Sequence, residues 1–225
     1  MKEPSDSPSV TNGCAQYDAV VKNLSAAVNR SFNDQNHYDL KTGDRMIKRQ
    51  WRHFNPQLKF WYDQMVTCYV RPHLEAHVYK SLPGAGKPAF LEPLISRNLH
   101  GSTRRSLDWH YDGINELVKV LLYLTDVDER SGCFTAFLHT ESSVPLRIRP
   151  AVTLEYLNPN DLPNIHPEWV AELIEHSFRP WCATGPAGTM VTFDTSIIHW
   201  ASRLEEGHIR DTINFQIKVP RTRIS

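Results

Sequence analysis

Three apolar runs of strand length in the C-terminal half set limits on how this chain can fold. The first spans residues 117–124 and ends in a turn-prone stretch. The second spans residues 188–199, and the third, residues 212–219, alternates apolar with polar side chains. Such alternation is typical of a strand with one face in a core. Strands of this kind, separated by turns, predict an all-β barrel or jelly roll.

Residues that could bind a metal ion lie next to these runs. His110 and Asp112 precede the first run, and His199 ends the second. Residues two apart on a strand point to the same side, so His110 and Asp112 can reach one ion while Tyr111 faces away. Two imidazoles and one carboxylate on one face of a metal leave three positions open, as non-haem Fe(II) oxygenases need. The pattern therefore predicts a mononuclear iron site.

A carboxylate-binding group is predicted beside this metal. Arg210 opens the third strand, eleven residues beyond His199. Its planar guanidinium offers two parallel donors to a carboxylate, whereas lysine would be a point charge. Thr212 lies on the same face and could add a hydroxyl donor. Asn98, on an expected earlier strand, could bond the same carboxylate or serve a turn at the strand end.

Each of these residues also has a purely structural interpretation. A single H-x-D triplet arises by chance in a chain with eleven histidines. Arg210 alone would most often be solvated, and Thr212 is a good strand former. Trp109 and Trp200, which flank the two histidines, could line the pocket mouth or pack in the barrel wall. The combination of ligands at strand ends with a following arginine favours the metal site.

A resemblance to a known family rests on the same residues. The H-x-D triplet at 110–112, the distal His199 and the arginine beyond it resemble the Fe(II)/2-oxoglutarate-dependent dioxygenases of the phytanoyl-CoA dioxygenase type. Residues 121–128, followed by Gly132, are also similar to the strand and turn after the H-x-D of that family. The resemblance covers residues 96–219.

This resemblance implies a mainly β fold, a double-stranded β-helix core with flanking α-helices. It implies that Fe(II) is held by His110, Asp112 and His199, and that 2-oxoglutarate is held by Arg210, Thr212 and Asn98. It implies an enzyme that uses O2 to hydroxylate, or otherwise oxidise by C–H abstraction, a small-molecule metabolite or natural-product intermediate. Succinate and CO2 would be released, and ascorbate could support the reaction in vitro.

Two other functions remain open from the sequence. Prolyl or other peptidyl hydroxylases share the chemistry and the H-x-D triplet. They more often anchor the co-substrate with lysine, so Arg210 and the insert before His199 argue against them. A catalytically idle, cupin-like metal-binding module is the second alternative. Succinate release on adding iron, 2-oxoglutarate and ascorbate would separate an enzyme from such a module.

The rest of the chain is predicted more coarsely. A single domain is expected over residues 14–225, after a Ser- and Pro-rich tail at 1–13 that is expected to be disordered. The further expected elements are helices at 18–32 and 55–75, a polar loop at 33–45, and early strands at 77–82 and 90–98. The second helix carries a broad apolar stripe suited to packing on a sheet.

The segment between Gly132 and Gly188 is expected to decide substrate choice. It carries an Asn- and Pro-rich stretch at 158–164 and then a helix with Pro167 in its first turn, where a missing N–H does no harm. Residues 158–175 are interpreted either as a lid that excludes water or as a structural helix that covers a sheet face.

Composition bears on partners and compartment. Lys plus Arg equals Asp plus Glu at 25 each, so the charge balance does not favour nucleic acid or an anionic membrane. No apolar run is long enough to span a bilayer, and no signal-peptide core is present. A cytoplasmic protein that acts on a small molecule is expected, with its oligomeric state open. The cysteines lack zinc spacing and are expected to be free thiols: Cys14, Cys68, Cys133 and Cys182.

Overall fold

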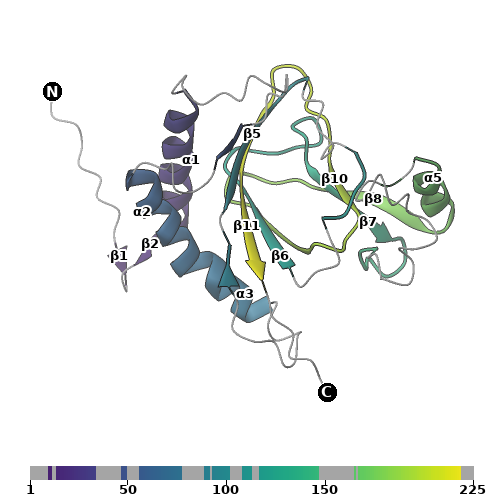
Figure 1. Ribbon diagram of the computed structural model, residues 1–225, viewed down its shortest axis with the longest axis horizontal. Coiled ribbons are helices and arrows are strands. Elements are labelled where there is room, and N and C mark those ends of the chain that lie inside the picture. The colour runs from purple at the N-terminus through teal and green to yellow at the C-terminus, as the bar shows by residue number, and fades with distance from the viewer. Residues whose placement is uncertain are drawn as a thin grey trace.

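Two antiparallel sheets packed face to face form the centre of the molecule (Figure 1). The computed structural model describes residues 10–11, 14–33, 47–49, 56–77, 89–91, 93–101, 108–112, 117–146, 165 and 167–218. Within these residues the strands pair only in antiparallel fashion. The prediction of a mainly β, double-stranded β-helix core is confirmed.

The larger sheet holds most of the strands. Its order is β3 (Ile47–Arg49), β5 (Leu94–Leu99), β11 (Ile209–Lys218), β6 (Leu117–Tyr123) and β9 (Met190–Asp194), with β4 (Ala89–Phe90) paired to the end of β11. The smaller sheet has the order β10 (His199–Ala201), β7 (Phe134–His139) and β8 (Phe178–Ala183). Near the N-terminus, β1 (Val10–Thr11) pairs with β2 (Cys14–Ala15).

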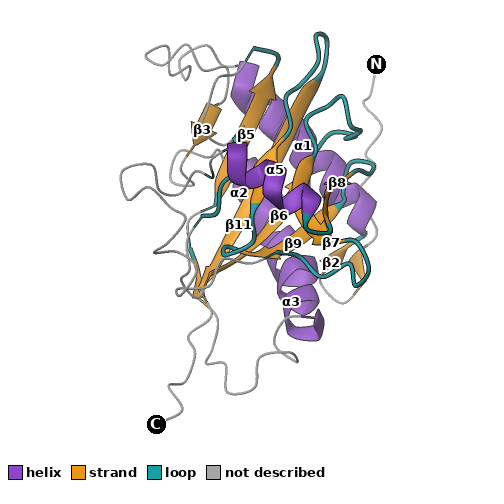
Figure 2. Ribbon diagram, turned by 90° about the vertical axis from the view of Figure 1, so that its right-hand side faces the viewer, coloured by secondary structure: helices purple, strands orange, loops and turns teal. Residues whose placement is uncertain are grey.

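Helices cover the outer faces of both sheets (Figures 1 and 2). The larger sheet is covered by α1 (Tyr17–Asn33), α2 (Pro56–Met65), the π-helical turn η3 (Val66–Val70) and α3 (Arg71–His77). Helix α5 (Pro167–Glu175) packs on the smaller sheet. The helices predicted at 18–32 and 55–75 are confirmed, and the π turn η3 divides the second into α2 and α3. None of the described helices is long and apolar enough to cross a membrane.

The alternation along β11 separates a core from a cavity. Ile213, Phe215 and Ile217 are fully buried against the helices of the larger sheet. Arg210 and Thr212 point the other way, into the space between the two sheets. The prediction of a strand with one apolar face is therefore confirmed, and its polar face lines the interior of the barrel.

Three of the coarser predictions can be compared with the described residues only in part. The strand predicted at 90–98 is split between β4 and β5, and the break falls at Pro93, which has no N–H to give to a strand ladder. Of the strand predicted at 77–82, only His77 is described, and it ends α3. The polar loop at 33–45 lies outside the described residues except for Asn33, the last residue of α1.

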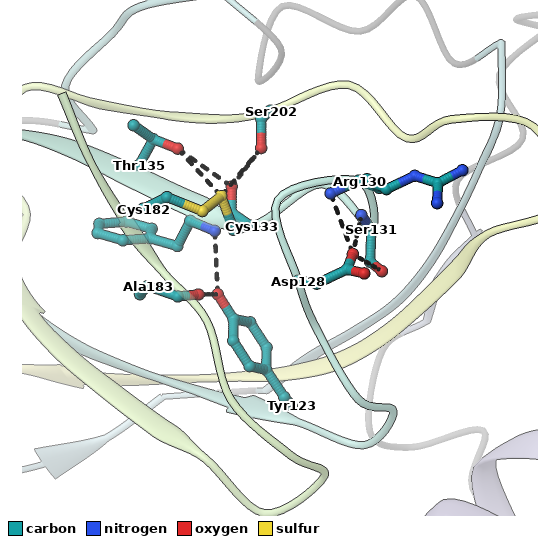
Figure 3. Close-up of a disulfide and its surroundings, with 10 residues drawn as sticks. Tyr123, Asp128, Arg130, Ser131, Cys133, Thr135, Cys182, Ala183 and Ser202 are labelled. Carbon is teal, nitrogen blue, oxygen red and sulfur yellow. Dashed lines mark hydrogen bonds between the residues drawn. A yellow bond between two sulfur atoms is a disulfide. The ribbon is translucent and has the colours of Figure 1, made fainter.

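The cysteines overturn the expectation of free thiols. Cys14 is bonded to Cys68, which ties β2 to η3 with the Cα atoms 5.9 Å apart. Cys133 is bonded to Cys182, which ties the start of β7 to β8 with the Cα atoms 5.7 Å apart (Figure 3). The pairs are separated by 54 and 49 residues in the sequence. Only the tertiary fold brings these partners together, so cysteine spacing could not indicate the pairing.

Removal of the bond between the two sheet strands is expected to lower stability. The double variant Cys133→Ser/Cys182→Ser should lose about 2–4 kcal/mol of unfolding free energy, because the bond restricts the unfolded chain. Urea unfolding with and without a reductant measures the effect. The same reductant should shift the double variant less than the wild type, and equal shifts would contradict a stabilising role for this disulfide.

Candidate metal centre

A single β-bridge between His110 and His199, with Asp112 in the loop that follows, brings the three predicted metal ligands together. The backbone N–H of His110 donates to the carbonyl of His199 at 2.9 Å, and the N–H of His199 donates back at 2.8 Å. Asp112 is held by its own N–H, which donates to the carbonyl of Thr195 at 2.9 Å. One ligand atom from each of the three side chains lies within 4.8 Å of the others. The His–Asp–His group predicted from the sequence is thus a compact cluster that could hold a metal ion.

Backbone carbonyls orient both imidazoles towards this cluster. Nδ1 of His110 lies 2.7 Å from the carbonyl oxygen of Asp108, and Nδ1 of His199 lies 2.8 Å from that of Ile197. A carbonyl only accepts hydrogen bonds, so Nδ1 carries the proton in each ring and Nε2 is left as the ligand atom. Burial, helped by the neighbouring His199, lowers the pKa of His110 to about 4. His110 is therefore neutral at pH 7, the form that binds metals.

The Asp112 carboxylate faces His199 and a lysine. Its Oδ2 lies 3.3 Å from Nε2 of His199 and 2.6 Å from Nζ of Lys119. Burial alone would raise the pKa of Asp112, but His199 and Lys119 outweigh it and hold that pKa well below its usual range. With the Nδ1 proton of His199 directed at the carbonyl of Ile197, its Nε2 faces a carboxylate oxygen of Asp112. A cation between these two acceptors removes their repulsion, so the donor set fits a metal ion.

Arg210 is a buried cation on the other side of the same cavity. Its side chain is 4 % exposed, and burial lowers the pKa of Arg210 to about 10, which leaves it charged at neutral pH. Among the described residues no carboxylate pairs with it, and its Nη1 has no hydrogen-bond partner. A buried charge without a counter-ion is unfavourable. The guanidinium therefore fits an anionic ligand that enters the cavity.

Asn98 and Thr212 lie around this guanidinium. Asn98 is the partner of Arg210 in the pairing of β5 with β11. With its amide oxygen turned towards the guanidinium, Asn98 accepts hydrogen bonds from Arg210, including one from Nε at 3.2 Å. Thr212 lines the same cavity of about 150 Å³. The carboxylate-binding residues predicted from the sequence are thus brought together, with Asn98 placed to orient Arg210.

Aromatic side chains enclose the cluster. The rings of Phe134 and Phe193 lie 5.2 and 5.0 Å from the ring of His199. Trp200 lines the cavity, whereas Trp109 stacks on Phe137 in the wall. One of the two tryptophans therefore lines the pocket and the other packs in the barrel wall.

Tyr123 fixes the spacing between the two sheets at this end of the barrel. From β6 of the larger sheet, its hydroxyl donates to the carbonyl of Ala183 at 3.0 Å and accepts from the N–H of Phe134 at 2.9 Å (Figure 3). Both of these partners belong to the smaller sheet. Phe134, which encloses the metal cluster, is thereby held in place from the opposite sheet.

Sequence reasoning missed Lys119. It lies within a run that is otherwise apolar, between Val118 and Val120, and its side chain points into the cavity. A single charged residue inside a buried strand is the signal that could have revealed it, because lysine is almost never fully buried without a partner.

The predicted lid region is only partly described. Helix α5 begins at Pro167, as predicted, and packs through Leu173 on the outer side of the smaller sheet, near Phe137 and Ile198. No residue of α5 lines the metal cavity. Residues 158–164 lie outside the described part of the chain. The packing of α5 fits the alternative of a structural helix, and the lid at 158–175 stays a prediction.

Comparison with known proteins identifies the fold. Neither a protein-family model nor a curated protein sequence matches the chain. AviO1 from Streptomyces viridochromogenes matches with a TM-score of 0.57 and 14 % identity, over 95 % of this chain and 87 % of that one. EctD from S. alaskensis, crystallised with 2-oxoglutarate and 5-hydroxyectoine, matches with a TM-score of 0.58 and 14 % identity, over 96 % of this chain and 70 % of that one.

A third structure is described as SnoN, a non-haem alpha-ketoglutarate-dependent epimerase from nogalamycin biosynthesis. It matches with a TM-score of 0.56 and 13 % identity, over 89 % of this chain and 74 % of that one. At such low identities the likeness establishes architecture. The chain has the jelly-roll fold that these structures share.

Proposed function

We propose that this protein is an Fe(II)- and 2-oxoglutarate-dependent dioxygenase that oxidises a C–H bond of a small molecule, with release of succinate and CO2. The observation that carries the proposal is one cavity that holds both a His–Asp–His cluster and a buried guanidinium with an unpaired N–H. An ion and a dianionic co-substrate would satisfy both groups at once. The phytanoyl-CoA dioxygenase type remains our placement within these enzymes, on the strength of the sequence pattern.

The protein's own residues would hold the iron. His110 and His199 present Nε2, and Asp112 presents a carboxylate oxygen, so ligands come from one side and coordination positions remain for the co-substrate and O2. The carbonyls of Asp108 and Ile197 keep the two rings in the ligating tautomer. When bound, iron and 2-oxoglutarate supply the oxidising chemistry, and the protein supplies position and shielding. Phe134 and Phe193 would shield the His199 side of the cluster from water.

The co-substrate would be held at its far end by Arg210. A guanidinium grips the C5 carboxylate with parallel donors, and Asn98 keeps the guanidinium oriented. Thr212 adds a hydroxyl donor. Two neighbours support this assignment, since EctD was crystallised with 2-oxoglutarate and SnoN is described as dependent on it. The 5-hydroxyectoine present in the EctD crystal and the origin of SnoN in nogalamycin biosynthesis also favour a small molecule or natural product over a peptide.

The test is to supply the protein with Fe(II), 2-oxoglutarate, O2 and ascorbate and to measure succinate. Enzymes of this class release some succinate even without their true substrate, so slow formation that depends on iron is expected. Iron binding without 2-oxoglutarate binding or succinate would instead indicate the idle metal-binding module. Turnover raised by proline-rich peptides, and not by small metabolites, would favour the peptidyl hydroxylase.

Thr212→Val is expected to weaken 2-oxoglutarate binding modestly. The loss should be at most about 1.5–3 kcal/mol, the range for one hydrogen bond to a charged group. Calorimetric titration of 2-oxoglutarate into protein loaded with Co(II) measures it without turnover. Thr212→Ser, which keeps the hydroxyl, should bind as the wild type does. Unchanged affinity in Thr212→Val would remove this residue from the co-substrate site.

A further inference from the structure

The ammonium of Lys119 lies inside the metal cavity. Lys119 is on β6 and is 9 % exposed. Its neighbours Val118 and Val120 face the helices on the other side of the sheet. The ammonium is 2.6 Å from Oδ2 of Asp112, and the side chain lines the same cavity as Arg210. Lys119 adds a positive charge to the site. Neither metal binding by the His–Asp–His cluster nor co-substrate binding by Arg210 requires this charge.

The charges of the described lining residues do not cancel. Among these residues one carboxylate, Asp112, stands against two cations, Lys119 and Arg210. Fe(II) and the 2-oxoglutarate dianion neutralise each other, so one positive charge remains among the described lining residues. An uncompensated charge on side chains as buried as those of Lys119 and Arg210 is unfavourable. A single carboxylate would cancel this excess charge.

Metal binding would release Lys119 from Asp112 and let it bind a carboxylate. In the absence of an ion, the Lys119 ammonium and Nε2 of His199 both lie against the same Asp112 oxygen. A divalent cation at that oxygen repels the ammonium. The lysine side chain is long and flexible and carries three donors, so it can turn to a nearby anion.

The position of Lys119 separates it from the arginine. In the pairing of β6 with β11, Lys119 lies opposite Gln216. Arg210 is six residues away from Gln216 on β11, a separation of about 20 Å along the strand. The two cations therefore enter the cavity from opposite ends. Arg210 suits the far carboxylate of the co-substrate, and Lys119 is left for a different anion.

We propose that Lys119 is a substrate-binding residue and that the substrate is a monocarboxylate, held with its acid group beside the metal. The inference rests on the proposed function, because the excess charge is counted with Fe(II) and 2-oxoglutarate in place. A lysine whose only role is to pair with Asp112 would support the fold but would not distinguish a carboxylate ligand from a neutral one of the same shape.

The experiment compares two probes of equal shape, propanoate and propanamide. The protein is loaded with Co(II) and 2-oxoglutarate, which gives no turnover, and the paramagnetic ion broadens the proton signals of a molecule bound next to it. Propanoate should bind about tenfold or more tightly than propanamide, the value of one charge-assisted hydrogen bond. Lys119→Met should remove this preference, and Lys119→Arg should retain much of it.

Two controls accompany these variants. Lys59→Met removes a lysine of an exposed ion pair on α2, with side-chain exposures of 57 % and 50 %, and should leave the preference unchanged. Circular dichroism checks the fold of each variant, and Lys119→Gln replaces Lys119→Met if the latter does not fold.

Three results would overturn the proposal, and they differ in what else they affect. Equal broadening of both probes by the wild type would remove the carboxylate preference and leave the proposed function intact. A loss of 2-oxoglutarate affinity in Lys119→Met, equal to the loss for propanoate, would assign Lys119 to the co-substrate. A wild-type protein that binds neither Co(II) nor 2-oxoglutarate would overturn the proposed function as well.

Discussion

His199→Ala is expected to abolish iron-dependent turnover while the fold is retained. Loss of a partner in the outer shell of a metal site typically costs 10–100-fold in affinity, so loss of a ligand should cost at least about 100-fold. His110→Ala and Asp112→Ala should behave alike, because each removes one of three ligand atoms that lie within 4.8 Å of one another. Titration with Fe(II) without O2 measures affinity, and succinate release measures turnover.

The control for these variants is another histidine. His176 is exposed, follows α5 and is not part of the cluster, so His176→Ala should bind Fe(II) and release succinate as the wild type does. Circular dichroism should show the same spectrum for the three ligand variants and for His176→Ala. Full turnover of 2-oxoglutarate by His199→Ala would disprove the metal assignment.

Arg210→Ala is expected to raise the 2-oxoglutarate requirement steeply and to leave Fe(II) binding nearly unchanged. Truncation of one partner of a buried charge pair costs about 2–5 kcal/mol, which corresponds to a loss of about 30-fold to several thousand-fold in affinity. Arg210→Lys should recover part of the loss, because an ammonium supplies the charge without the two parallel donors. Calorimetry with Co(II)-loaded protein separates co-substrate binding from metal binding.

Arg97 provides the matched control for Arg210. It lies on β5 next to Asn98 and faces the helices, where it forms an ion pair with Asp211 at 2.6 Å. Arg97→Ala should therefore lower the unfolding free energy without changing 2-oxoglutarate affinity. An unchanged 2-oxoglutarate affinity in Arg210→Ala would place the co-substrate anchor elsewhere in the cavity.

The parts of the site that follow from strand parity were predictable from the sequence. Arg210 and Thr212 are two residues apart on β11, so they share a face whatever the strand pairs with. The apolar residues of β11 show by the same parity which face meets the core. These predictions depend only on local geometry, which the sequence specifies directly. His110 and Asp112 were predicted to share a strand face, but they lie in a single bridge and the loop after it.

The parts that depend on strand register were not predictable. Lys119 reaches Asp112 because β6 lies beside β11 and β9, and Asn98 meets Arg210 because β5 pairs with β11 in one register. Neither contact is implied by spacing along the chain. The position of α5 likewise depends on which sheet face remains uncovered. A helical pattern alone does not show whether the helix closes over the cavity or covers a sheet.

The two disulfides and the proposed iron centre need opposite redox conditions in the same protein. An iron centre of the proposed kind works only as Fe(II), which calls for a reductant, whereas the bonds Cys14–Cys68 and Cys133–Cys182 are open to attack by thiol reductants. Cys133 directly precedes Phe134, which lies against the metal ligand His199. Purification in dithiothreitol would therefore protect the iron and loosen the wall beside it, while ascorbate, which is not a thiol, can serve the metal and leave both bonds intact.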